Sequence, residues 1–228
     1  MGLFEREQDE YGSEGTGALS VIAIENDFVT RVYEKIATSY DIFFGKTLSA
    51  GRRLAHRHMG LRPGDQVLEV GVGTGINATL YPSTCSITGI DLSAPMLEIA
   101  RDRIARAGLH NVRLFEMDAA ALTFPDDSFD VVFAPYLINC VSDPLAVVRE
   151  MRRVCRPGGK LMFVNHFRSP NPVLSRVERM VSPLTVHIGF KSDFDLHGFL
   201  AQANLEPATI HHVSAARLWS VISYINEK

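Results

Sequence analysis

Three glycines at alternate positions, directly after an apolar run, are the residues of this sequence best suited to hold a ligand. The run is Val67-Leu68-Glu69-Val70, and Gly71, Gly73 and Gly75 follow it. Glycine adopts positive φ and has no Cβ, so its backbone can lie directly against a bound molecule. A nicotinamide or flavin fingerprint needs its third glycine five residues after the first, where this chain has Ile76. The spacing therefore disfavours a dinucleotide.

Two acidic residues follow the next two predicted strands. Asp91 lies 20 residues after Gly71, where a carboxylate can accept hydrogen bonds from a ribose diol. Asp118, in Met117-Asp118-Ala119, can accept from the exocyclic amino group of a base. Taken singly, these are ordinary loop glycines and a surface acid. Together they predict a ligand-binding site at one edge of the sheet, because open α/β sheets bind ligands at the carboxyl ends of their strands.

Seven short runs rich in apolar and β-branched residues alternate with helical patterns along the chain. This alternation predicts an α/β protein with a mostly parallel sheet and helices on both faces. The last two strands are close enough in sequence to pair antiparallel. We expect strands at 66–70, 86–90, 112–117, 130–134, 160–165, 208–213 and 220–225. We expect helices at 19–37, 46–59, 94–107 and 196–203, and one that begins at Ser142-Asp143-Pro144 and stops at Arg156-Pro157-Gly158-Gly159.

Composition and charge exclude several classes of protein. The chain has 228 residues, 46% of them hydrophobic, which suits one α/β core and is too short for two ordinary domains. A net charge of -3 argues against a nucleic-acid binder. The three cysteines, Cys85, Cys140 and Cys155, form no CxxC pair. We therefore expect no disulfide framework, no metal site and a reducing cytoplasm.

The joint pattern resembles the class I S-adenosylmethionine-dependent methyltransferases, which have a Rossmann-like fold. Besides the glycine loop, the resemblance rests on four segments: Gly89-Ile90-Asp91-Leu92-Ser93, Met117-Asp118-Ala119, Phe129-Asp130-Val131-Val132 and Arg156-Pro157-Gly158-Gly159. It implies a seven-stranded sheet with an antiparallel last strand. It also implies S-adenosylmethionine as cofactor, with the three glycines at its methionine part, Asp91 at the ribose and Asp118 with Ala119 at the adenine. The other implied cofactor-binding residues are Tyr40, Glu69, Thr74, Asn77, Leu92, Met96 and Ala134.

A narrower resemblance is to the soluble bacterial phosphatidylethanolamine N-methyltransferases. The segments similar to that group are 33–41 with Phe44-Gly45-Lys46, the strand end Val164-Asn165-His166-Phe167, and 189–194. The resemblance implies methylation of phosphatidylethanolamine, and of its mono- and dimethyl derivatives, towards phosphatidylcholine. The product of the cofactor would be S-adenosylhomocysteine.

An amine acceptor must lose a proton before it can attack the methyl group. His166 and Tyr40 are the candidate catalytic residues for this step. Aromatic faces can hold the cationic product, and Tyr33, Tyr40 and Tyr136 are candidate walls. The remaining candidate substrate-binding residues are Asn139 and, as partners of a phosphate, Arg168, Arg179 and Lys191.

Each of these residues also has a simpler interpretation. His166 can be a surface histidine at a strand end, Tyr40 can pack its helix onto the sheet, and Tyr136 and Asn139 can belong to the core. A solvated helix face explains most single arginines. The basic group Arg52, Arg53, Arg57 and Arg62 can instead meet anionic lipid.

The expected organisation has three parts. Residues 1–18 form a disordered acidic tail, 19–60 an amphipathic helix and lid, and 61–228 the methyltransferase core with an insertion at about 167–195 that roofs the substrate. The uncharged run from Val70 to Ile90 contains four glycines and Pro82, so it is expected to be strand–loop–strand and not a membrane span. We expect a cytoplasmic protein, peripheral at an anionic membrane surface, without an obligate protein partner.

Three alternatives stay open. A class I methyltransferase acting on a quinone precursor or another small molecule shares most of these motifs. A nonenzymatic S-adenosylmethionine-binding or membrane-associated module would keep the fold without the transfer. A nicotinamide oxidoreductase is disfavoured by Ile76.

Overall fold

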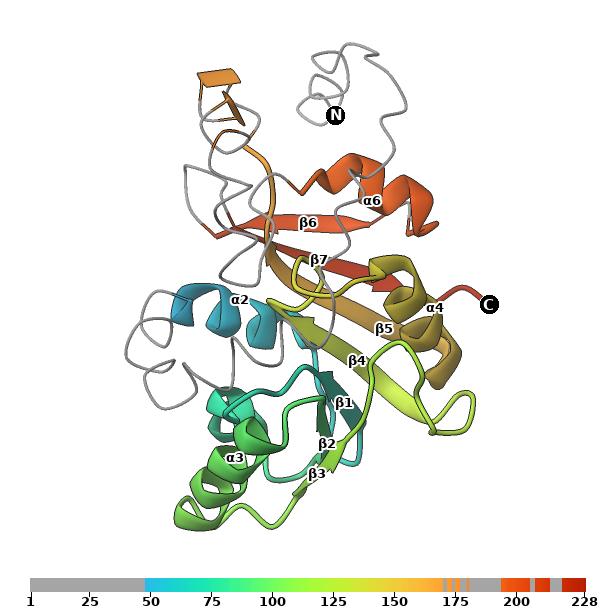
Figure 1. Cartoon of the computed structure of the whole chain (residues 1–228). Coiled ribbons are helices and arrows are strands. Elements are labelled where there is room, and N and C mark those ends of the chain that lie inside the picture. The colour runs from blue at the N-terminus through green and yellow to red at the C-terminus, as the bar shows by residue number, and fades with distance from the viewer. Residues whose placement is uncertain are drawn as a thin grey trace.

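The computed structural model describes residues 48–169, 172–173, 175–176, 180, 194–205, 208–213 and 219–228. These residues form one seven-stranded sheet in the order β3-β2-β1-β4-β5-β7-β6 (Figure 1). The strands are β1 (Gln66–Val70), β2 (Ser86–Asp91), β3 (Val112–Glu116), β4 (Phe129–Pro135), β5 (Cys155–His166), β6 (Thr209–His212) and β7 (Trp219–Ile225). The helices are α2 (Ser49–Met59), η1 (Ile76–Leu80, a 3-10 helix), α3 (Ala94–Arg106), α4 (Pro144–Val154) and α6 (Leu196–Gln202).

Strand direction agrees with the predicted class of sheet. β3, β2, β1, β4 and β5 are mutually parallel, whereas β7 pairs antiparallel with both β5 and β6. All seven residues of β4 are buried. A strand buried on both faces reads as a continuous apolar run, which is why its position could be predicted.

Two apolar clusters lie on opposite faces of the sheet. On one face, Ala55 and Met59 of α2 pack with alternate strand residues such as Phe133. On the other face, α4 and α6 pack over residues such as Leu68 and Phe163. The prediction of helices on both faces is therefore confirmed.

Side-chain caps begin three helices at the positions that their sequences indicate. Ser93 accepts from the backbone N–H of Met96 at 3.4 Å, and Asp143 accepts from that of Ala146 at 2.8 Å. Each cap satisfies a backbone N–H that has no partner inside its helix. Asp195 starts α6 in the same way.

β5 starts earlier than its apolar run indicates, at Cys155 instead of Lys160. Residues 156–159 were expected to separate the helix from the strand. They belong to β5 instead, because Asn226 binds this segment. Its side chain donates to the carbonyls of Arg152 at 3.0 Å and Cys155 at 2.7 Å. Its backbone also exchanges hydrogen bonds with Gly158 and Gly159. The η1 helix after the glycine loop was not predicted.

Several predictions fall outside the described residues. These are the tail at 1–18, the helix at 19–37, the start of the helix at 46–59 and much of the insertion at 167–195. Across the described segments, no helix is long and apolar enough to cross a membrane.

Candidate active site

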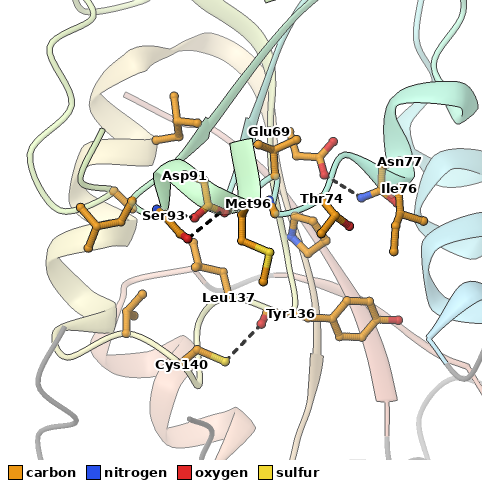
Figure 2. A pocket seen from close by; sticks show the side chains of 18 of the residues that line it. Glu69, Thr74, Ile76, Asn77, Asp91, Ser93, Met96, Tyr136, Leu137 and Cys140 are labelled. Carbon is orange, nitrogen blue, oxygen red and sulfur yellow. Dashed lines mark hydrogen bonds between the residues drawn. The ribbon is translucent and has the colours of Figure 1, made fainter. Parts of the chain in front are cut away.

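A cleft opens at the carboxyl ends of β1, β2 and β4, with α2 contributing one wall (Figure 2). It holds about 1040 Å³ of empty space, open solvent included. Of the candidate cofactor residues, those that line it are Glu69, Gly71, Gly73, Thr74, Asn77, Asp91, Leu92, Met96 and Ala119.

The glycine loop needs its glycines for different reasons. All three have positive φ, between 54° and 76°. A Cβ at Gly71 would come within 2.9 Å of Leu137, and one at Gly75 within 3.0 Å of Ala100 in α3. A Cβ at Gly73 would meet no described atom within 4 Å. Gly71 and Gly75 therefore permit close packing, while Gly73 lets the backbone turn through the cleft.

A cation from α3 holds this loop in place. Arg103 donates from Nη1 to the carbonyl of Thr74 at 2.5 Å and to its hydroxyl at 3.2 Å. Thr74 is 2% exposed, so this contact anchors the loop from behind.

Asp91 connects the loop to the helix that follows it. One carboxylate oxygen accepts from the N–H of Gly73 at 2.8 Å and the other from that of Ser93 at 2.9 Å. Burial raises the pKa of Asp91, and these backbone hydrogen bonds oppose the rise. Each oxygen has two lone pairs, so the carboxylate can still accept from a vicinal diol.

Glu69 lies beneath the loop with both oxygens engaged. Asn77 donates to Oε1 at 2.7 Å and the Tyr81 hydroxyl donates to Oε2 at 2.5 Å. Burial raises the pKa of Glu69 to about 7, against the opposing effect of these hydrogen bonds and the charge of Arg52. The acid thus orients Asn77 while it also lines the cleft.

One end of the cleft presents both a cation and a hydrogen-bond acceptor. Arg52 is 5% exposed and lines the cleft. Asn77 also lines it, and its Oδ1 is buried without a hydrogen-bond partner in the described part of the chain. A guanidinium and an amide oxygen suit a ligand that carries a carboxylate and an ammonium group. These residues therefore fit the amino-acid end of S-adenosylmethionine.

Tyr136, directly after β4, adopts a strained conformation at the cleft. Its φ is 58°, which is costly for a bulky side chain. Its N–H donates to the carbonyl of Val164 at 2.6 Å and its hydroxyl to that of Leu48 at 2.7 Å. The Arg52 guanidinium lies over its ring. These contacts hold the residue in its strained form and turn it towards α2.

Another part of the cleft lining is apolar. Met117 and Ala119 line it, together with Ile90, Leu92 and Met96, as a flat base would require. Asp118 is not among the residues that line this cleft, and its Oδ1 accepts from the N–H of Ala120 at 2.8 Å. Neither Gly75 nor Ala134 is among the lining residues.

Three candidate acceptor residues of the described chain, His166, Asn139 and Arg168, are not among the residues that line the cleft. The ring of His166 packs edge-on against Trp219 at 5.8 Å, and burial lowers the pKa of His166. Asn139 donates to the carbonyl of His166 at 3.1 Å. Arg168 lies 3.4 Å from Asp195, which brings the two ends of the insertion together. Of these candidates, Tyr136 alone lines the cleft.

Four candidate site residues lie outside the described residues: Tyr33, Tyr40, Arg179 and Lys191. No group of three or more His, Cys, Asp or Glu in the described part of the chain could hold a metal ion.

Sequence reasoning missed several residues of the cleft. Leu137 and Cys140 follow β4 without a motif, and Tyr81 reaches Glu69 from a segment with no functional signature. The possibility that Arg52, Arg53, Arg57 and Arg62 together meet anionic lipid is wrong for Arg52. The other three are exposed, whereas Arg52 is buried in the cleft. Its spacing of three from buried Ala55 would have indicated this.

The sequence matches a methyltransferase-domain family over residues 68–163. It is 40% identical over 202 residues to a phosphatidylethanolamine N-methyltransferase of Cereibacter sphaeroides, covering 88% of this chain and 98% of that protein. It is 31% identical to the ubiquinone/menaquinone biosynthesis C-methyltransferase of Ectopseudomonas mendocina, covering 77% and 73% of the two chains.

Solved structures support the same fold. The YcgJ protein of Bacillus subtilis matches with a TM-score of 0.66 at 22% identity, covering 78% of this chain and 98% of that one. Phosphoethanolamine N-methyltransferase 2 of Haemonchus contortus, in complex with S-adenosyl-L-methionine, matches with a TM-score of 0.72 at 17% identity, covering 92% and 61%. Because the chain is 40% identical to a methyltransferase over almost the whole length of that relative and also matches the methyltransferase-domain family, it belongs to the class I S-adenosylmethionine-dependent methyltransferases.

Proposed function

We propose that this protein methylates the amine of phosphatidylethanolamine, and then its mono- and dimethyl derivatives, to form phosphatidylcholine. The observation that carries the proposal is the 40% identity to a bacterial phosphatidylethanolamine N-methyltransferase over 98% of that protein. The cleft supports the methyl-transfer part of the proposal, because its lining has the chemistry that the methyl donor requires.

The residues of the cleft suggest how S-adenosylmethionine would be held. Asp91 would accept hydrogen bonds from the ribose, and Arg52 and Asn77 would bind the amino-acid end. Met117 and Ala119 would flank the adenine. Asp118 lies outside the cleft lining. It would therefore act on the adenine through the backbone of its neighbours and not through direct contact of its own carboxylate.

The cofactor supplies an activated methyl group on a sulfonium, so the protein must align the acceptor and remove a proton. A primary ammonium has a pKa of about 10, and burial beside positive charge lowers it. His166 and Tyr40 are our two candidates for the base that removes this proton. Burial lowers the pKa of His166, which favours the neutral imidazole, the form that can accept a proton.

The phosphate of the substrate needs a cation outside the cleft. Arg168 is our candidate within the described residues, with Arg179 and Lys191 as further candidates. Arg168 lies 3.4 Å from Asp195, and both side chains are more than a third exposed. An ion pair this exposed is weak, so a phosphate could replace Asp195 as the partner of Arg168.

We also propose a peripheral position at an anionic membrane surface on the cytoplasmic side. Two large apolar side chains in the insertion support it: Val173 is 67% exposed and Met180 79% exposed. Arg176 lies between them in sequence. Apolar side chains next to a cation suit the interface of an anionic bilayer.

The test is transfer of radiolabelled methyl from S-adenosylmethionine to phosphatidylethanolamine in mixed liposomes. Thin-layer separation resolves the mono-, di- and trimethylated products. Label in those spots is the expected result. S-adenosylhomocysteine binding without any labelled phospholipid would contradict the acceptor and leave the family membership standing.

A quinone precursor is the second candidate acceptor, favoured by the 31% identical C-methyltransferase. Such an acceptor carries no phosphodiester, so it needs no phosphate-binding cation. Arg168→Ala should then leave transfer unchanged, whereas a phospholipid acceptor predicts a raised KM. Assaying wild type and this variant with both acceptors separates the two candidates.

A further inference from the structure

Asn165 is a buried amide at the carboxyl end of β5. It is 0% exposed, and neither its Oδ1 nor its Nδ2 has a hydrogen-bond partner among the residues that the structure describes. Burying an amide without partners is unfavourable, and such groups are normally paired with protein, water or ligand. Its hydrogen-bonding capacity therefore indicates a further binding group.

The neighbours of Asn165 connect it to the cleft. The carbonyl of Val164, the preceding residue, accepts from the N–H of Tyr136 at 2.6 Å. The carbonyl of His166, the following residue, accepts from Asn139 at 3.1 Å. Tyr136 lines the cleft, and so does Cys140, which follows Asn139. Asn165 is thus flanked on both sides by residues that hydrogen-bond the loop forming this wall of the cleft, although it is not itself among the residues that line the cleft.

Asn165 also begins a polar row on a face that is otherwise apolar. Opposite it on β7 is Ser220, and opposite Ser220 on β6 is His212, whose Nδ1 lies 2.9 Å from the Ser220 hydroxyl. Residues directly opposite share one face of a sheet.

The preceding row on the same face is Phe163, Ile222 and Ile210, all apolar. The face therefore changes from apolar to polar at the end where an acceptor would approach.

We propose that Asn165 is a substrate-binding residue, whose Oδ1 accepts an N–H of the acceptor amine and so aims the nitrogen lone pair at the methyl group. This inference rests on the proposed function. The lone pair forms the C–N bond as the C–S bond breaks, and the sulfonium becomes the thioether of S-adenosylhomocysteine. The resulting ammonium then loses a proton to solvent or to His166.

This role has a signature that a structural amide lacks. The reactive, neutral form of phosphatidylethanolamine has two N–H bonds, and that of its monomethyl derivative has one. The neutral dimethyl amine has none, so Asn165 Oδ1 has nothing to accept in the last methylation. The first two methyl transfers depend on Asn165, and the third does not.

The experiment measures kcat/KM of wild type, Asn165→Leu and Asn165→Ala with the three amines presented separately in mixed micelles. We expect a loss on the order of tenfold for the first two acceptors and no change for the dimethyl derivative. S-adenosylhomocysteine affinity should be unchanged. The Tm of Asn165→Leu should equal or exceed that of wild type, because an apolar group replaces an unpaired amide. Ser220→Ala, a change at the next position of the polar row, is the matched control. Its kcat/KM relative to wild type should be the same for all three acceptors.

Two results would overturn the inference: unchanged activity of both variants on all three acceptors, or an equal loss on all three. The second would mark Asn165 as structural. A wild-type protein that methylates none of the three amines would instead show that the proposed function itself is wrong.

Discussion

The guanidinium carbon of Arg52 lies 5.2 Å from the centre of the Tyr136 ring, inside the cleft. The Tyr136 hydroxyl in turn donates to the carbonyl of Leu48, 88 positions earlier in the chain. A Cβ at Gly51 would overlap this hydroxyl, so the first turn of α2 can approach closely only with glycine there. The wall contributed by α2 and the wall that follows β4 therefore form one unit.

Arg52→Leu should weaken binding of S-adenosylhomocysteine far more than binding of 5′-methylthioadenosine, which lacks the amino-acid end. Loss of a hydrogen-bonded ion pair to the carboxylate predicts a rise in Kd on the order of 10- to 100-fold for the first ligand. Calorimetry with both ligands makes the comparison. Arg53→Leu, an exposed change on the same helix, is the control. Equal losses for the two ligands would mean that Arg52 only supports the fold.

Asp91→Ala should raise the Kd of S-adenosylhomocysteine by at least about tenfold, because charged hydrogen bonds to the ribose are lost. The N–H groups of Gly73 and Ser93 also lose their acceptor, which loosens the loop. Calorimetry measures the affinity. Asp102→Ala, an exposed change on α3, should leave the affinity at the wild-type value. An unchanged Kd for Asp91→Ala would remove this residue from the ribose site.

Glu69 should make folding stability depend on pH. Its pKa is about 7 in the folded protein, against 4.5 for an ordinary glutamate. A carboxyl with a raised folded pKa contributes stability below its unfolded pKa, and this contribution is lost as pH rises towards the folded value. Glu69→Gln does not titrate.

The free energy of unfolding of wild type minus that of Glu69→Gln should therefore fall by roughly 3 kcal/mol between pH 4.5 and 7, and then level off. Urea unfolding across this pH range provides the measurement. The difference between the two proteins cancels contributions from all other titrating groups. Parallel stability curves would show that Glu69 does not change its protonation there.

His166→Gln should lower kcat on the order of 100-fold if His166 takes the proton of the amine. The Kd of S-adenosylhomocysteine should stay the same, because His166 is not among the residues that line the cleft. Steady-state kinetics at saturating lipid separates kcat from binding. Trp219→Phe, which keeps an aromatic ring against the imidazole, is the control for packing. A wild-type kcat in His166→Gln would assign the base to another group.

Deletion of residues 1–35 should weaken sedimentation with anionic liposomes, because the apolar stripe predicted for helix 19–37 is removed. Vesicles with and without anionic lipid separate apolar insertion from attraction by charge. The deletion protein should still bind S-adenosylhomocysteine if the lid is not needed for folding of the core. Equal sedimentation of both proteins would move the membrane contact to another part of the surface, such as Val173 and Met180.

Much of the fold could be predicted because its signals are local. Buried parallel strands such as β1 and β4 are continuous apolar runs, and Ser93 and Asp143 cap their helices through backbone groups within three residues. The start of β5 could not be predicted in this way. It depends on Asn226, some 70 residues later in the chain.

The sequence by itself determined the class of fold, the glycine loop and the acidic residue that ends β2, because strand periodicity and glycine spacing are short-range properties. Only the tertiary structure decided that Arg52 enters the cleft, that Glu69 is engaged by Tyr81 and Asn77, and that Asp118 lies outside the cleft lining. These outcomes depend on which face of a helix or turn is buried against a distant strand. Burial also raises the pKa of Glu69 and leaves Asn165 without partners in the described chain, and neither can be read from spacing alone.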